Sequence, residues 1–251
     1  EGFRRAWNRN DHPAALDFLQ ELLSRPLSPS EKRFYTHLVG ITEGMVAWDL
    51  FQHKAAWQSL KAHLEPALSI AEAWGHGAKV RVLQELQEAK ARLRAILDRE
   101  GKPTFPMLAD LLANAERRAA SGRYDDALAR LYRAIELAAE ADLYERTGIE
   151  LRSASSYPDK LQDLAQRSGR LSGLKEALVL AFELDTRLKN TDTLVQRLYT
   201  DYQSKLQSPL VRRHNSILAH GTKPVKQADY EALRDYLREQ KLEAAPPWPR
   251  W

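Results

Sequence analysis

Arg213 and His220 are the residues of this sequence whose types and spacing best suggest chemistry. They lie seven residues apart in a predicted helix over 209–220, so both fall on one face about two turns apart. Arginine neutralises the charge that builds on a phosphodiester during cleavage, and histidine transfers a proton. Gly221 ends the helix after His220, and a helix C-terminus favours the protonated imidazole. The pair predicts metal-free phosphodiester cleavage, with an ordinary polar helix face as the alternative.

The surrounding segment is locally basic. The chain has 38 Lys and Arg against 34 Asp and Glu, a net charge of +4 that by itself decides little. Between Gln207 and Lys226, however, there is no acidic residue, and there are two histidines and four bases: Arg212, Arg213, Lys223 and Lys226. This concentration of positive charge favours a polyanionic partner such as a nucleic acid.

The composition excludes several other chemistries. The chain contains no cysteine, which removes disulfides, thiolate metal sites and cysteine nucleophiles and suits a reducing compartment, so we expect a cytoplasmic protein. No phosphate-binding glycine loop, HExxH or GxSxG motif occurs. We therefore expect no metal and no cofactor. The first five histidines lack metal-ligand spacing and are expected at the surface or at helix boundaries: His12, His37, His53, His63 and His76.

The elements that must position Arg213 and His220 are helices. Helix formers dominate the sequence, and strand-like alternation of β-branched residues is missing. No apolar run approaches the length of about 18 residues that a membrane span needs, so we expect no membrane contact. The pattern predicts an all-α, multi-helix bundle with helices over about 13–24, 30–51, 54–74, 78–99, 105–120, 124–146, 158–166, 173–189, 193–206, 209–220 and 227–241.

Gly101 and Pro103 mark the best candidate domain boundary, because neither residue continues a helix easily. We predict an N-terminal helical region over 1–100, a helical domain over 104–243 and an extended tail over 244–251. The tail contains Trp248 and Trp251 between prolines, and the sequence leaves open whether it docks or is disordered.

The predicted helix over 124–146 carries one clear apolar stripe. Its acids, the pair Asp125–Asp126 and the pair Glu136–Glu140, are interpreted as solvated helix charges. For Arg133 and Glu136 two interpretations stand: a surface ion pair three residues apart, or support beneath the helix that carries Arg213 and His220.

The stretch from Arg213 to Gly221, RHNSILAHG, resembles the signature of HEPN-domain ribonucleases, in which histidine follows arginine after four to six residues, commonly with asparagine near the arginine. The sequence of this stretch, from Asn215 to Gly221, is similar to that of the CRISPR-associated ancillary ribonucleases of type III systems. Ala47–Phe51 and Leu131–Ala138 also resemble this family. The resemblance implies a HEPN-like nuclease domain in the C-terminal half, and in this family such a domain follows an N-terminal sensor of cyclic oligoadenylate.

The resemblance also implies a mechanism. The ribose 2′-hydroxyl of single-stranded RNA attacks the adjacent phosphorus, with His220 as general acid/base or positioning group for that hydroxyl. Arg213 would stabilise the pentacoordinate phosphate, and Asn215 would position the backbone or the scissile phosphate. Flanking phosphates would contact Arg212, His214 and Lys223, for which ordinary surface charge is the alternative.

The same resemblance implies a homodimer in which two Arg/His sets line one cleft. This chain shows no βαβ pattern and starts at Glu1 rather than Met, so we expect the sensor, and any cyclic oligoadenylate binding, upstream of it. Two other functions remain open. One is a non-catalytic helical interaction module, suggested by a tetratricopeptide-like turn over 121–128 and by the tryptophans. The other is a HEPN toxin of a toxin–antitoxin pair.

Overall fold

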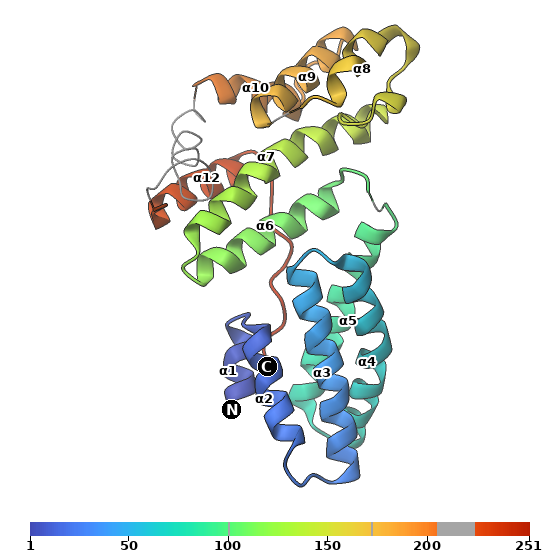
Figure 1. The fold of residues 1–251 in the computed structure, drawn as a ribbon, viewed down its shortest axis with the longest axis vertical. Coiled ribbons are helices and arrows are strands. Elements are labelled where there is room, and N and C mark those ends of the chain that lie inside the picture. The colour runs from blue at the N-terminus through green and yellow to red at the C-terminus, as the bar shows by residue number, and fades with distance from the viewer. Residues whose placement is uncertain (100, 172, 205–223) are drawn as a thin grey trace. The chain divides into compact units, whose positions relative to one another are not determined.

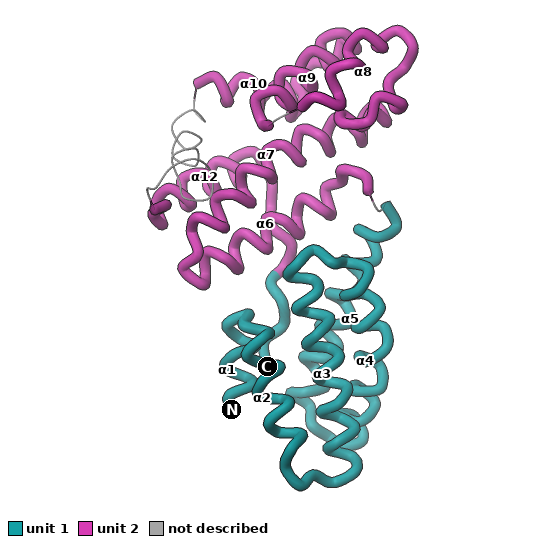
Figure 2. The backbone as a smooth tube through the Cα atoms, in the orientation of Figure 1, with its two compact units in different colours: residues 1–100, 247–251 teal, residues 101–246 magenta. Residues whose placement is uncertain are grey.

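The structure is a computed structural model and describes residues 1–99, 101–171, 173–204 and 224–251. Every regular element in these ranges is a helix, which confirms the all-α prediction (Figure 1). The chain divides into two compact units (Figure 2). Unit 1 comprises residues 1–100 and 247–251, and unit 2 comprises residues 101–246.

Unit 1 is built from α1 (Gly2–Asn8), α2 (His12–Leu23), α3 (Pro29–Asp49), α4 (His53–Ala73) and α5 (Gly77–Leu97). Along the chain, α2 contacts α3, α3 contacts α4 and α4 contacts α5. The start of α3 is fixed by a capping box, in which the Ser28 hydroxyl accepts the Glu31 N–H and the Glu31 carboxylate accepts the Ser28 N–H. Buried side chains at three- and four-residue spacing line one face of α3: Phe34, Leu38, Ile41, Met45 and Trp48.

A close approach between α3 and α4 depends on Gly40. A Cβ atom added there would lie 2.2 Å from Cδ2 of His63, so no larger residue fits without a shift of the ring. The same packing brings Nδ1 of His63 within 3.1 Å of Nδ1 of His37. Two protonated rings would repel each other at this distance, so simultaneous protonation of both rings is disfavoured.

This histidine pair is expected to make the stability of the protein depend on pH. Burial, and then the charges of His63 and Arg33, lower the pKa of His37 below its ordinary value. As the pH falls, His37 therefore binds a proton in the unfolded chain before it does so in the folded protein. The stability that is present above a pH of about 6.5 is lost as the pH falls toward the lowered pKa of the folded state. We expect the free energy of unfolding by urea to decrease more between about pH 7 and pH 5 in the wild type than in His37→Gln.

The matched control for that comparison is His76→Gln, since His76 is exposed at the N-terminal end of α5. This variant should keep the wild-type pH dependence. Equal pH dependence in His37→Gln and the wild type would contradict the assignment of the effect to the His37–His63 pair.

The C-terminal residues pack within unit 1. Trp248 is 6% exposed, and its ring lies 5.0 Å from that of His12 and 5.5 Å from that of Trp48. Asn8 holds Trp251 by two hydrogen bonds, donating from Nδ2 to the Trp251 carbonyl and accepting the Trp251 N–H at Oδ1, at 3.0 and 2.8 Å. Of the two alternatives for the tail, the structure shows the docked one. His12 and His53 are the first residues of α2 and α4, so both lie at helix boundaries as expected, although both side chains are buried and that of His12 is only 1% exposed.

Unit 2 contains α6 (Phe105–Ala120), α7 (Tyr124–Thr147), α8 (Gln162–Ser168), α9 (Leu174–Arg187), α10 (Leu194–Ser204) and α12 (Gln227–Glu239), with short 3₁₀ helices at Ala154–Ser156 and Asp159–Leu161. The long helix α7 contacts α6, α9, α10 and α12, so it is surrounded on several sides (Figure 1). The single helix predicted over 158–166 is instead a 3₁₀ turn followed by α8. Among the described helices, none combines the length and hydrophobicity needed to cross a bilayer.

Candidate functional site

The predicted site residues all lie in the segment 205–223, outside the described residues: Arg212, Arg213, His214, Asn215, His220 and Lys223. The predicted helix over 209–220 lies there too. The structure describes the helices on either side of this segment. Before it stands α10, which ends at Ser204, and after it stands α12, which begins at Gln227. Both helices contact α7.

Asp201 ties the last turn of α10 to the end of α12. Its carboxylate is buried and accepts hydrogen bonds from the Tyr236 hydroxyl at 3.2 Å and from Nε2 of Gln240 at 3.3 Å. Burial, together with the nearby Asp201 charge, raises the pKa of Tyr236, so the phenol keeps its proton and acts as the donor. The chain is therefore fixed four residues before the segment that carries the predicted site.

A second contact fixes the chain after that segment. The backbone N–H of Val225 donates to Oδ1 of Asp125, in the first turn of α7, at 3.3 Å. Directly beyond it, the Asp229 carboxylate accepts the Lys226 N–H at 3.0 Å at the start of α12. Asp125 is half-buried, so this helix charge is only partly solvated and also accepts the Val225 N–H. Asp126, beside it, forms ion pairs with Arg130 and Arg118.

Glu136 and Glu140 form the centre of a charge cluster on α7. The two residues are 7% and 4% exposed, so the interpretation of this pair as solvated charges is wrong. Arg133 donates to Glu136 at 2.9 Å and to Glu140 at 2.9 and 3.2 Å, while Arg152 donates to Glu140 at 2.8 Å. Two carboxylates thus face two guanidinium groups, and the mutual repulsion of the acids is offset.

The local backbone explains how Arg152 reaches this cluster. Gly148 ends α7 in the left-handed conformation, with φ of +74°, which glycine adopts without the steric cost of a Cβ. The chain reverses there, and Arg152 returns to Glu140, twelve residues earlier. The predicted Arg133–Glu136 ion pair is therefore present, although Glu136 is buried rather than at the surface. Its supporting role beneath the Arg213–His220 segment stays a prediction.

A further buried acid, which the sequence analysis did not single out, joins three parts of unit 2. Asp185 on α9 is 0% exposed and accepts hydrogen bonds from Arg146 of α7 at 2.9 and 3.1 Å, and from Asn190 at 3.0 Å. The Thr193 hydroxyl, just before α10, also donates to it. A signal was present in the sequence, since Asp185 continues the apolar spacing of α9: Leu174, Ala177, Leu178, Ala181 and Leu184.

The described ranges contain no group of three or more His, Asp or Glu side chains placed to hold a metal ion. The polar clusters of unit 2 are instead ion pairs and hydrogen bonds between helices. They act as fixed connections around α7, which contacts both α10 and α12, the helices before and after the segment with the predicted site.

Unit 2 is all-helical, and comparison with known families identifies the class of protein to which it belongs. Residues 96–242 match the family model described as the Csm6 HEPN domain, and residues 1–90 match the one described as the Csm6 6H domain. The first match covers more than half of the chain, so the chain belongs to the Csm6 HEPN family. The predicted resemblance to CRISPR-associated HEPN proteins is thereby confirmed. No curated protein matches this chain.

Proposed function

We propose that this chain is an endoribonuclease that cleaves single-stranded RNA without a metal ion. The observation that carries the proposal is the extent of the Csm6 HEPN match, which contains all six predicted site residues within residues 96–242. HEPN families generally contain ribonucleases. In this proposal residues 104–243 form the nuclease domain, and residues 1–100 connect it to further regulatory sequence.

The proposed reaction needs two proton transfers and one displacement at phosphorus. The ribose 2′-oxygen forms a bond to the adjacent phosphorus while the bond from phosphorus to the 5′-oxygen breaks, which leaves a cyclic phosphate and a 5′-hydroxyl. His220 transfers the proton or orients the 2′-hydroxyl, and Arg213 neutralises the extra negative charge on the pentacoordinate phosphate. Asn215 positions the scissile phosphate or the backbone beside it.

Binding and regulation complete the proposal. Arg212, His214 and Lys223 contact flanking phosphates, which fixes the register of the RNA without reading its sequence. Two copies of the chain form a homodimer and place two Arg213–His220 sets along one cleft. The enzyme acts in the cytoplasm in CRISPR antiviral defence. Cyclic oligoadenylate binds a sensor domain outside this chain and regulates the enzyme only through that domain.

Cleavage in the presence of a chelator tests this proposal. We expect the purified protein to cut labelled single-stranded RNA in excess EDTA at the rate seen without chelator, because arginine and histidine supply all the required groups. Loss of cleavage in EDTA that returns with an added divalent ion would contradict metal independence. Failure to cut RNA at high protein concentration, with a tightly bound protein partner recovered instead, would favour the non-catalytic interaction module.

A further inference from the structure

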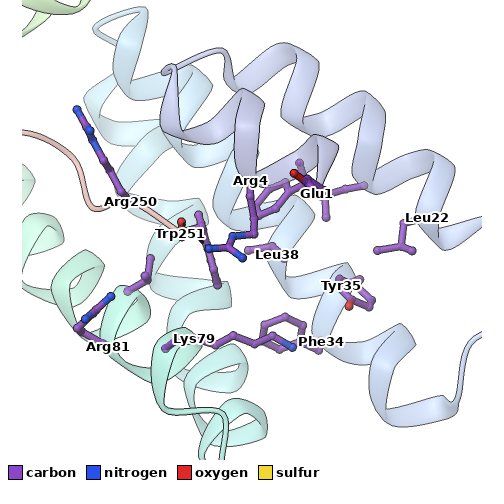
Figure 3. A pocket seen from close by; sticks show the side chains of 14 residues that line it. Glu1, Arg4, Leu22, Phe34, Tyr35, Leu38, Lys79, Arg81, Arg250 and Trp251 are labelled. Carbon is purple, nitrogen blue, oxygen red and sulfur yellow. Dashed lines mark hydrogen bonds between the residues drawn. The ribbon is translucent and has the colours of Figure 1, made fainter.

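Unit 1 contains a cavity of about 520 Å³ that the proposed RNA cleavage does not use (Figure 3). This volume lies within the range of about 300–1,000 Å³ that is usual for small-molecule sites. Apolar side chains from α1, α2, α3, α5 and the C-terminal tail line it: Phe3, Leu19, Phe34, Leu38, Val82 and Trp251. The cavity therefore has the walls of a site for an apolar molecule.

The charged residues around this cavity are mostly basic. Arg4, Lys79, Arg81 and Arg250 line it together with one acid, Glu1. The acid has its own partner, because Glu1 forms an ion pair with Arg5 at 3.5 Å. Figure 3 shows the side chains of Arg4 and Lys79 directed inward, whereas that of Arg250 is directed away. Arg81 is 72% exposed and pairs with Glu85 at 3.9 Å.

Arg4 and Lys79 have no side-chain carboxylate at ion-pair distance among the residues that the structure describes. Arg4 makes one long hydrogen bond, 3.4 Å, to the main-chain oxygen of Trp251, the last residue of the chain. The Lys79 ammonium lies 5.0 Å from the centre of the Phe34 ring and 4.8 Å from that of Trp74. Burial lowers the pKa of Lys79, although Glu31 acts in the opposite direction, so part of the hydration of this ammonium is already lost. An anion beside Lys79 would replace part of the hydration that this ammonium has lost, and the exposed Arg4 supplies a second positive charge for it.

We propose that this cavity binds an amphipathic organic anion, with its apolar body against Leu19, Leu38 and Val82 and its anionic head between Arg4 and Lys79. The uncharged lining residues offer hydrogen-bonding groups at Tyr35 and Trp251 alone, and the indole Nε1 of Trp251 is buried without a partner. Walls with so few polar groups suit an alkyl or aryl chain better than a nucleobase, whose polar edges would stay unpaired.

Calorimetric titration of the full protein with decanoate, below its micelle concentration, tests this proposal. Decanol serves as the neutral ligand of the same chain length, decyl phosphate as a second anionic head, and adenosine monophosphate as an anion with a polar body. We expect decanoate and decyl phosphate to bind at one site per chain and decanol to bind at least about tenfold more weakly, since a hydrogen bond to a charged group contributes roughly that factor.

Matched variants locate the head group. Arg4→Gln and Lys79→Gln should each weaken decanoate binding by about tenfold. Arg250→Gln removes the same charge from a side chain directed away, and Arg81→Gln removes it from an exposed side chain paired with Glu85, so each should change binding by less than about twofold. Thermal unfolding of each variant reports whether it folds. Equal losses in all four variants, equal affinity for decanol and decanoate, tighter binding of adenosine monophosphate, or no binding at all would each overturn the proposal.

Discussion

Replacing Arg213 or His220 with alanine is expected to lower the rate of RNA cleavage by about 10²- to 10⁴-fold, the largest effect expected of any single substitution in this chain. Without His220 no positioned group transfers the proton of the 2′-hydroxyl, and without Arg213 the charge on the pentacoordinate phosphate is left to solvent. The rates are measured under single-turnover conditions in EDTA with saturating protein, so that weaker binding does not imitate slower chemistry.

The matched controls come from the same basic segment. Arg212→Ala and Lys223→Ala also remove one positive charge each, but their proposed contacts are to flanking phosphates. These variants should weaken RNA binding and reduce its dependence on salt, while the saturated rate stays close to that of the wild type. Saturated rates in Arg213→Ala and His220→Ala that stay within about threefold of the wild type would contradict the site assignment, since each proposed group supplies a far larger factor.

The second large effect is expected at Asp185. Its replacement by alanine removes the acceptor shared by Arg146, Asn190 and Thr193 and leaves buried donors without a partner. Breaking a buried ion pair costs about 3–5 kcal/mol, and we expect the lower end of this range because Arg146 keeps its ion pair with Asp142 at 2.8 Å. Urea unfolding measures the change in the free energy of unfolding directly.

An exposed ion pair beside α9 supplies the control for Asp185. Asp163 and Arg187 lie 2.6 Å apart, with side chains that are 57% and 47% exposed. Because exposed pairs contribute about 0–1 kcal/mol, Asp163→Ala should be nearly neutral. A loss of stability in Asp185→Ala no greater than in Asp163→Ala would show that the buried cluster does not join α7, α9 and the start of α10 as described.

The helices are predictable from sequence where local signals define them. The observed α6 has the predicted ends, since Thr104 caps its start, accepting the Met107 N–H, and Gly122 lies in the turn after it with φ of +73°. In contrast, no helix was predicted before residue 13. The short helix α1 packs against tail residues more than 240 positions away, and no local pattern contains that information.

The burial of the charged residues of α7 is not predictable from sequence for a similar reason. The apolar stripe of α7 suggests one buried face, but α7 contacts α6, α9, α10 and α12, and Glu136 and Glu140 are buried as well. The proposed roles of Arg213, Asn215 and His220 rest on the sequence of one short segment. The family match supports the class of protein, a CRISPR-associated HEPN protein, that this segment indicates. The contacts that bracket the segment, at Asp201 and Val225, join residues 35 and 100 positions apart and could not be read from sequence.

The chemical ends of the RNA products test the central proposal most directly. The wild-type protein in excess EDTA should produce fragments that end in a 2′,3′-cyclic phosphate and begin with a 5′-hydroxyl, because the 2′-oxygen is the proposed nucleophile. A substrate with a single 2′-deoxynucleotide at the cleaved position should resist cutting there. Fragments with 3′-hydroxyl and 5′-phosphate ends, or unchanged cleavage at the 2′-deoxynucleotide, would contradict attack by the 2′-hydroxyl and with it the proposed roles of Arg213 and His220.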